Sequence, residues 1–367
     1  RRQQHSCLSD SDADLRTELP DSDHLFCTRA MLGNGRQHEK LQQPQRAVPR
    51  SIPPRLLAKL AEVDALVKRK RWAEAHETLE DLDQHFPSNP AILIELVNVC
   101  YELKDMEGYQ YAGERLLKID PNHADAALSV AGAYMANLRP AMALRAFRSF
   151  LQRFPDHPRA GEANKAAVDL ESIIGEMLSD LGLSGETGLQ LAAMHEEMQS
   201  DLSHGKYAQV HRIGAELLRH YPNFVPALNN ISLAYFAEGE IDRAIDFAQR
   251  TLSLEPDNIH ALSNLVHYLC VNGRWAEARQ VAERLMTSQA KAMEPWLKRI
   301  EAFSFLGDDA AVVDIFTQAE QVDALQHPGI NPYIYHLVAA AELRLGREPA
   351  AKEHWRQALE VSPGLKV

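Results

Sequence analysis

The chain has 367 residues, of which 45% are hydrophobic and 25% charged, and its formal net charge is −12 at pH 7. This acidic balance argues against a nucleic-acid-binding protein, because such proteins usually present a basic face. No apolar run approaches the roughly 20 residues that a membrane-spanning helix needs. We therefore expect a cytoplasmic protein that neither binds nucleic acid nor inserts into a membrane.

The first 50 residues are polar and show no helical or strand periodicity, so we predict a disordered tail over residues 1–50. Cys7, Cys27, His24 and His38 fall in this tail, but their spacing fits no common zinc pattern. The chain begins with arginine rather than methionine. We interpret it as a fragment, a processed product or a gene model begun too early.

A first helical arm is predicted over residues 51–181. Three hairpins in it end at Pro87, Pro121 and Pro155, which follow one another at a fixed period (121 − 87 = 34 and 155 − 121 = 34). One long apolar stripe then covers residues 159–181. This stripe predicts a single long helix that caps the first arm.

A flexible joint is predicted at residues 182–190, where the period is lost, and a second helical arm over residues 191–367. The most regular hairpin of this arm has two apolar helices on either side of Gly239, because glycine suits the left-handed conformation that ends many helices. Ala244 and Ala248 lie on the apolar face of its second helix. Side chains this small predict a close approach of the two helices.

The repeating hairpins resemble the tetratricopeptide repeat family. The resemblance covers roughly residues 56–155 and 191–367, and its matching residues are Tyr134, Ala143, Phe147 and Pro155; Tyr235, Ala244 and Pro256; and Ala351, Trp355, Ala358 and Pro363. A fixed period of this length is the signature of a solenoid in which each hairpin stacks on its neighbours. The resemblance implies an all-α, right-handed superhelical solenoid of helical hairpins, in two arms.

The sequence contains no phosphate-binding loop, no GxSxG or HExxH motif and no CxxC pair, so we expect no enzyme, no cofactor and no metal. Cys100 and Cys270 lie among apolar neighbours in predicted helices, which indicates buried free thiols. His260 and His267 are seven residues apart and could face the same way, but a third metal ligand is not evident.

The resemblance implies that the first helix of each hairpin lines a concave groove. The candidate groove residues are Asn229, Asn230, Phe236, His260, Asn264, His267, Tyr333 and, in the first arm, Tyr101. Asn230 and Asn264 occupy equivalent sites one period apart (264 − 230 = 34). They resemble the asparagine ladder in the solenoid arm of a protein glycosyltransferase, where amides hold the backbone of an extended peptide.

Two features limit this ladder hypothesis. The equivalent sites before and after the pair hold Glu196 and Lys298, so the ladder has two rungs. Asparagine is also common at this site in tetratricopeptide repeats generally. The first arm is expected to differ, with an apolar groove suited to an amphipathic helix and lined by Leu57, Leu60, Ile94, Tyr101, Leu128 and Met135.

These features predict a non-enzymatic protein–protein interaction scaffold that binds peptide or helical segments in concave grooves. The alternative is the substrate-holding repeat arm of a larger enzyme, such as a protein glycosyltransferase, whose catalytic domain is absent from this sequence. A catalytic domain encoded directly downstream would favour the alternative.

Overall fold

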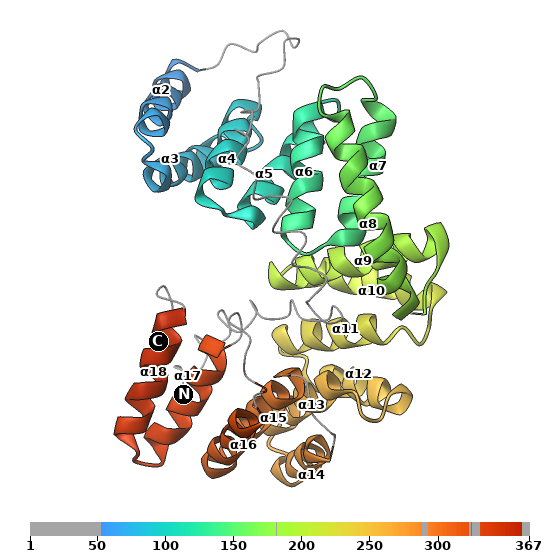
Figure 1. The fold of residues 1–367 in the computed structure, drawn as a ribbon, viewed down its shortest axis with the longest axis vertical. Helices are drawn as coiled ribbons and strands as arrows, with labels where there is room; N and C mark the ends of the chain where they lie inside the picture. Colours follow the sequence, from blue (N-terminus) through green and yellow to red (C-terminus); the bar gives the residue numbers. More distant parts are fainter. Residues whose placement is uncertain (1–52, 181, 288–292, 323, 325–330, 362–367) are drawn as a thin grey trace. The chain divides into compact units, whose positions relative to one another are not determined.

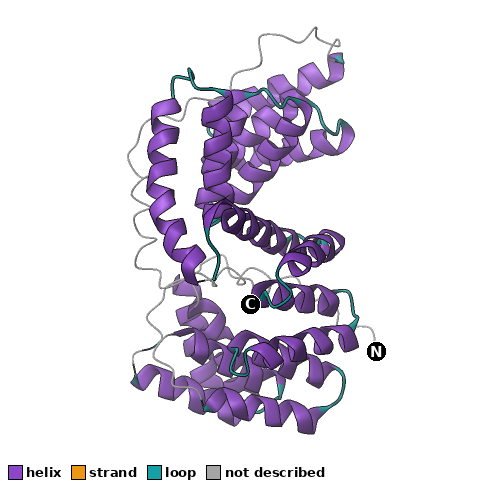
Figure 2. Cartoon of the chain, turned by 90° about the vertical axis from the view of Figure 1, so that its right-hand side faces the viewer, coloured by secondary structure: helices purple, strands orange, loops and turns teal. Residues whose placement is uncertain are grey.

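The structure is a computed structural model that describes residues 53–180, 182–287, 293–322, 324 and 331–361. Within these ranges every regular element is an α-helix and there is no strand (Figure 2). A search of the described helices finds none with the length and apolar character needed to cross a membrane. The predicted disordered tail at residues 1–50 lies outside the described residues.

The described helices follow one another as antiparallel hairpins (Figure 1). They are α2 (Pro54–Lys68), α3 (Trp72–His85), α4 (Pro90–Leu103), α5 (Met106–Ile119), α6 (Ala124–Ala136), α7 (Pro140–Arg153), α8 (Ala160–Asp180), α9 (Gly185–Ser203), α10 (Tyr207–His220), α11 (Val225–Ala237), α12 (Ile241–Leu254), α13 (Ile259–Val271), α14 (Trp275–Met286), α15 (Met293–Phe305), α16 (Asp309–Gln321), α17 (Asn331–Arg344) and α18 (Glu348–Val361). The predicted all-α solenoid of stacked hairpins is confirmed.

The turn inside each hairpin needs a residue in the left-handed region, and the chain meets this need in two ways. Gly239, between α11 and α12, has φ 81°. The corresponding turns after α4 and α6 use Lys104 at φ 64° and Leu138 at φ 57°. A side chain in this region costs about 1–2 kcal/mol. These two hairpins, and the first hairpin with Lys70 at φ 57°, therefore close at a cost that glycine avoids.

Packing divides the chain into two compact units that meet between Glu197 and Met198, within α9. We call the described residues 53–197 the N-terminal unit and the described residues from 198 onward the C-terminal unit. The predicted start of the second arm, residue 191, lies slightly earlier in the same helix.

The segment predicted as a joint, residues 182–190, overlaps α9, which begins at Gly185. Gly188, in the first turns of α9, lies so close to the preceding loop that a Cβ atom there would be 3.2 Å from the Leu183 Cβ. Glycine at this position therefore leaves room for the loop to pass close to the helix. Residues 185–190 are helical.

The N-terminal unit buries a continuous apolar core between successive hairpins. Its fully buried side chains include Leu56, Leu79, Ile92, Leu93 and Leu116. The helix predicted from the long apolar stripe is observed as α8, and its buried residues are Ala163, Ala167, Leu170, Ile174, Met177 and Leu178. Its apolar face packs against α7, so it covers the end of the preceding stack.

A buried carboxylate links α9 to the start of α7 in the N-terminal unit. Glu196 accepts hydrogen bonds from the backbone N–H groups of Ala141 (2.9 Å) and Met142 (2.7 Å). These two N–H groups belong to the first turn of α7, where a helix leaves its donors without internal partners. Burial raises the pKa of Glu196 to about 8, against the lowering effect of the two N–H groups and Arg139.

The C-terminal unit is organised around small residues and one buried tyrosine. Ala244 and Ala248 in α12 are 0% and 1% exposed, as their size predicts for a close helix crossing. Ser232 Oγ in α11 donates to the Ala244 carbonyl (3.1 Å) and lies 3.1 Å from the Tyr268 hydroxyl. This polar contact therefore connects α11, α12 and α13, and it satisfies groups that are otherwise buried in apolar surroundings.

Candidate peptide-binding surface

The first helices of successive hairpins form one layer of the C-terminal unit. α11 contacts α13, α13 contacts α15, and α15 contacts α17, in addition to the contacts within each hairpin. Seven of the eight candidate groove residues lie on α11, α13 and α17. The eighth, Tyr101, lies on α4 in the N-terminal unit.

Asn229 and Asn230 on α11 are buried, at 4% and 5% exposure. Among the described residues no donor reaches Asn229 Oδ1 and no acceptor reaches Asn230 Nδ2. A buried polar atom without a partner costs about 1–3 kcal/mol. These two amide atoms therefore offer one acceptor and one donor for which the described chain supplies no partner.

Asn264 and His260, two polar residues of α13, have different surroundings. Asn264 is half-buried and occupies the site equivalent to Asn230 in the next hairpin. His260 Nε2 lies 3.1 Å from Glu294 Oε1 at the start of α15. A carboxylate that was not predicted therefore lies beside His260.

His267 is an aromatic packing residue. Its ring lies flat on Phe305, with ring centroids 3.8 Å apart and planes at 5°, and its other neighbour is Phe236 at 4.6 Å. Burial lowers the pKa of His267 to about 4, so the ring is neutral at pH 7. The stack joins α11, α13 and α15, and it gives Phe236 and His267 a structural role in holding the layer together.

The remaining candidates are partly covered. Tyr333 on α17 packs against the core of the C-terminal unit. Tyr101 packs against Tyr109, with ring centroids 5.5 Å apart, and Lys104 Nζ lies 4.7 Å from the centre of the Tyr101 ring.

The predicted apolar groove of the first arm is wrong at three positions. Ile94, Leu128 and Met135 are buried, at 2%, 6% and 9% exposure, while Leu57 is 53% exposed. The helical period places a residue on an apolar face, but it does not say which neighbouring helix will cover that face. Here the adjacent hairpin covers it.

The sites that interrupt the asparagine ladder have partners of their own. Glu196 caps α7, as described above. Lys298 Nζ lies 3.0 Å from Glu301 Oε2 on the next turn of α15. Neither side chain repeats the arrangement of Asn230 and Asn264.

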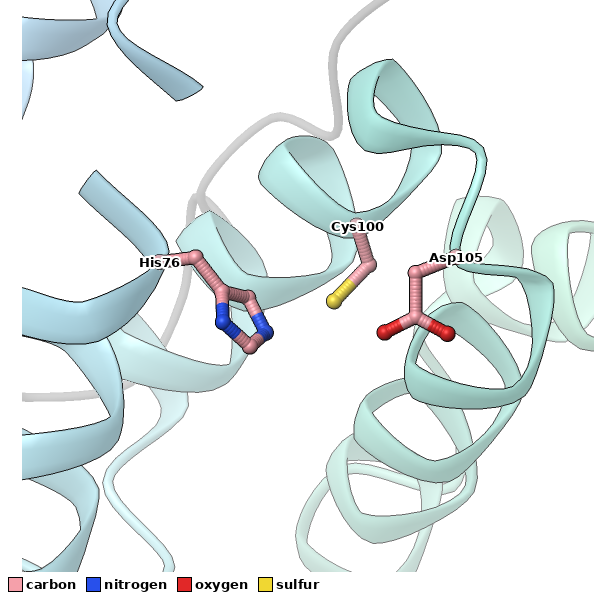
Figure 3. A group of neighbouring side chains, drawn as sticks. All are labelled: His76, Cys100 and Asp105. Atoms are coloured by element: carbon pink, nitrogen blue, oxygen red, sulfur yellow. The ribbon is translucent and has the colours of Figure 1, made fainter. Parts of the chain in front are cut away.

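A second group of side chains lies in the N-terminal unit, where His76, Cys100 and Asp105 point toward one another (Figure 3). One ligand-type atom of each residue lies within 4.8 Å of the other two. Cys100 and Cys270 are both free and buried, as predicted. Burial, reinforced by Asp105 and Glu80, raises the pKa of Cys100 to about 12.

Stacked antiparallel hairpins with a 34-residue period define a helical-repeat solenoid. Residues 235–296 match the family model described as tetratricopeptide repeat. A curated relative, TPR repeat-containing protein YvcD of Bacillus subtilis (strain 168), is 27% identical over 167 residues, a match that covers 40% of this chain and 34% of that relative. By these matches, residues 235–296 carry a tetratricopeptide repeat, and the chain is similar to tetratricopeptide repeat proteins.

Two solved structures are also similar. A tetratricopeptide repeat protein from Parabacteroides merdae ATCC 43184 is 13% identical and has a TM-score of 0.37, covering 78% of this chain and 98% of that one. The APC/C hetero-tetramer Cut9–Hcn1 is 11% identical and has a TM-score of 0.39, covering 83% of this chain and 79% of that one.

Proposed function

We propose that the chain is a non-enzymatic scaffold that binds an extended segment of another protein along α11 and α13. The observation that carries this proposal is the equivalent placement of Asn230 and the half-buried Asn264 on the neighbouring first helices α11 and α13. A peptide backbone presents an N–H donor and a C=O acceptor at every residue except proline, so it matches an amide side chain without requiring a particular side chain of its own.

The spacing of the helices fits such a ligand. Packed helices lie about 8–10 Å apart, and an extended peptide advances roughly 3.3 Å per residue, so equivalent sites on neighbouring first helices would meet every third residue or so. Asn230 and Asn264 are such equivalent sites. The half-buried Leu233 and Tyr333 supply apolar contact area on the same set of helices.

The double change Asn230→Ala and Asn264→Ala is expected to weaken partner binding. Each hydrogen bond contributes about 0.5–1.5 kcal/mol net, so the loss of two corresponds to at least about a five-fold rise in Kd. A partner is first isolated by affinity capture on the wild-type chain and identified by mass spectrometry. Its Kd for the wild-type and double-variant chains is then measured by titration calorimetry.

The matched control is Asn223→Ala, because Asn223 is exposed in the turn before α11. This variant is expected to bind like the wild type. Circular dichroism checks that all three proteins keep the same helix content. An unchanged Kd in the double variant would show that the two asparagines are a family feature without a part in recognition.

A further inference from the structure

We propose that His76, Cys100 and Asp105 form a binding site for a divalent cation, such as Zn²⁺, that prefers sulfur and nitrogen ligands. The three residues come from three elements of the N-terminal unit: His76 from α3, Cys100 from α4 and Asp105 from the residue that precedes α5. Imidazole, thiolate and carboxylate are the three side-chain ligands that zinc takes in proteins.

The distances suit this ion. The three ligand-type atoms lie within 4.8 Å of one another, and in Figure 3 His76 and Asp105 approach the Cys100 sulfur from opposite sides. In a tetrahedral zinc site, bonds of about 2.0–2.3 Å place the ligand atoms roughly 3.3–3.8 Å apart. A bound ion would hold the three ligand atoms at these shorter distances.

The start of α5 holds the carboxylate in place. Asp105 Oδ1 accepts a hydrogen bond from the Gly108 N–H (2.9 Å) and so caps the helix. Asp105 also accepts a hydrogen bond from the Cys100 thiol, and a metal ion would replace this contact. A Cβ atom at Gly108 would lie 2.9 Å from the Cys100 sulfur and would collide with Asp105 Oδ2. Only glycine at this position leaves the space in which the thiol and the carboxylate meet.

A further carboxylate lies near the imidazole. Glu80 lies one turn after His76 on α3, and its Oε2 is 3.6 Å from His76 Nδ1. A carboxylate beside one ring nitrogen favours the proton on that nitrogen and leaves the other to bind metal, an arrangement common around metal-ligating histidines. Glu80 thus favours Nε2 of His76 as the ligand atom. Its negative charge also contributes to the raised pKa of Cys100.

The charge balance of the cluster also favours a cation. Within the described residues, neither Asp105 nor Glu80 forms an ion pair with a lysine or an arginine. A divalent ion would offset two of the three negative charges that the two carboxylates and the thiolate carry. Binding forms a metal–sulfur bond and releases the thiol proton to solvent. The ion would then connect α3 of the first hairpin to both helices of the second, and it would stabilise the N-terminal unit against unfolding.

Cobalt titration tests this proposal, because Co²⁺ occupies zinc sites and its bond to a thiolate produces an intense absorption band. The full chain is used with Cys7→Ser and Cys27→Ser in the background, so that Cys100 and Cys270 are the two remaining cysteines. We expect one equivalent of Co²⁺ to bind with the thiolate band and to be displaced by Zn²⁺. The band should disappear in Cys100→Ser and persist in Cys270→Ser.

Asp105→Asn provides a variant that keeps the fold, since asparagine caps helices as well as aspartate does. It should weaken Zn²⁺ binding at least ten-fold without changing helix content, and His76→Gln should do the same. Absence of Co²⁺ binding to the background protein would overturn the proposal, as would a thiolate band that survives Cys100→Ser. If Cys100→Ser fails to fold, a Kd for Zn²⁺ that is unchanged in both Asp105→Asn and His76→Gln would overturn it equally.

Discussion

Replacing Tyr268 with alanine is expected to lower the free energy of unfolding of the C-terminal unit by about 3–5 kcal/mol, the usual cost of deleting a buried aromatic ring. Tyr268 is 1% exposed. Its ring stacks on Phe236 with centroids 4.6 Å apart, and its hydroxyl lies 3.1 Å from Ser232 Oγ. The change therefore removes packing at the point where α11, α12 and α13 meet.

Tyr268→Phe is the matched control for this change. It keeps the ring and removes only the hydroxyl, and Ser232 Oγ retains the Ala244 carbonyl as its hydrogen-bond acceptor. We expect a loss of about 1 kcal/mol for this variant. Urea denaturation gives the total loss of stability, and hydrogen exchange locates it.

Because a repeat stabilises mainly its neighbours, the protection lost in Tyr268→Ala should be greatest in α11–α15. Equal loss of protection in α4–α7 would contradict this account, and so would similar stability losses for the two Tyr268 variants.

Replacing Glu196 with alanine is expected to destabilise the N-terminal unit by about 1–3 kcal/mol, because it leaves two N–H groups at the start of α7 without an acceptor. Glu196→Gln keeps an acceptor oxygen and should cost less at neutral pH. Thermal or urea denaturation of the two variants beside the wild type measures this difference. Equal losses for alanine and glutamine would show that the cap contributes little.

The same residue predicts a pH dependence. Burial raises the pKa of Glu196 from 4.5 to about 8, so the folded chain keeps a proton that the unfolded chain loses above pH 4.5. A group with a raised folded pKa stabilises the fold at low pH, and this contribution falls as the pH rises through the folded pKa. Stability should therefore decrease between about pH 4.5 and 8, and this component should be absent in Glu196→Gln.

The comparison of the two proteins isolates Glu196, because every other titrating group is present in both. Stability is measured by urea denaturation at several pH values across the window. A wild-type slope that equals the Glu196→Gln slope would mean that Glu196 has the same pKa in the folded and unfolded chains.

The hairpin architecture could be predicted from the sequence because it depends on local signals that recur. Pro90 at the first position of α4 and Gly239 after α11 mark helix boundaries through their own backbone preferences. The small side chain of Ala244 likewise indicates a close helix crossing in its own hairpin. Each of these signals acts within one hairpin. Because the hairpins recur at a fixed period, a helix boundary found in one hairpin indicates the equivalent boundaries in the others.

Features that depend on packing between hairpins could not be predicted in this way. Glu196 was treated as an interruption of the ladder, but its carboxylate is engaged by backbone donors 54 and 55 residues away. His76 approaches Cys100 only because α3 packs against α4. Ile94 lies on an apolar face that the sequence assigned to a groove, and the structure buries it. Sequence spacing carries no direct signal for such contacts.

The most direct test of the proposed scaffold function is site-specific photo-crosslinking to a captured partner. A photoreactive amino acid is placed at Leu233 on α11 or, in a separate variant, at Gln249 on the exposed side of α12. If the partner lies along the first helices, the Leu233 variant will crosslink to it efficiently and the Gln249 variant will not. Crosslinking from Gln249 alone would show that the partner binds the second helices, and it would contradict the account.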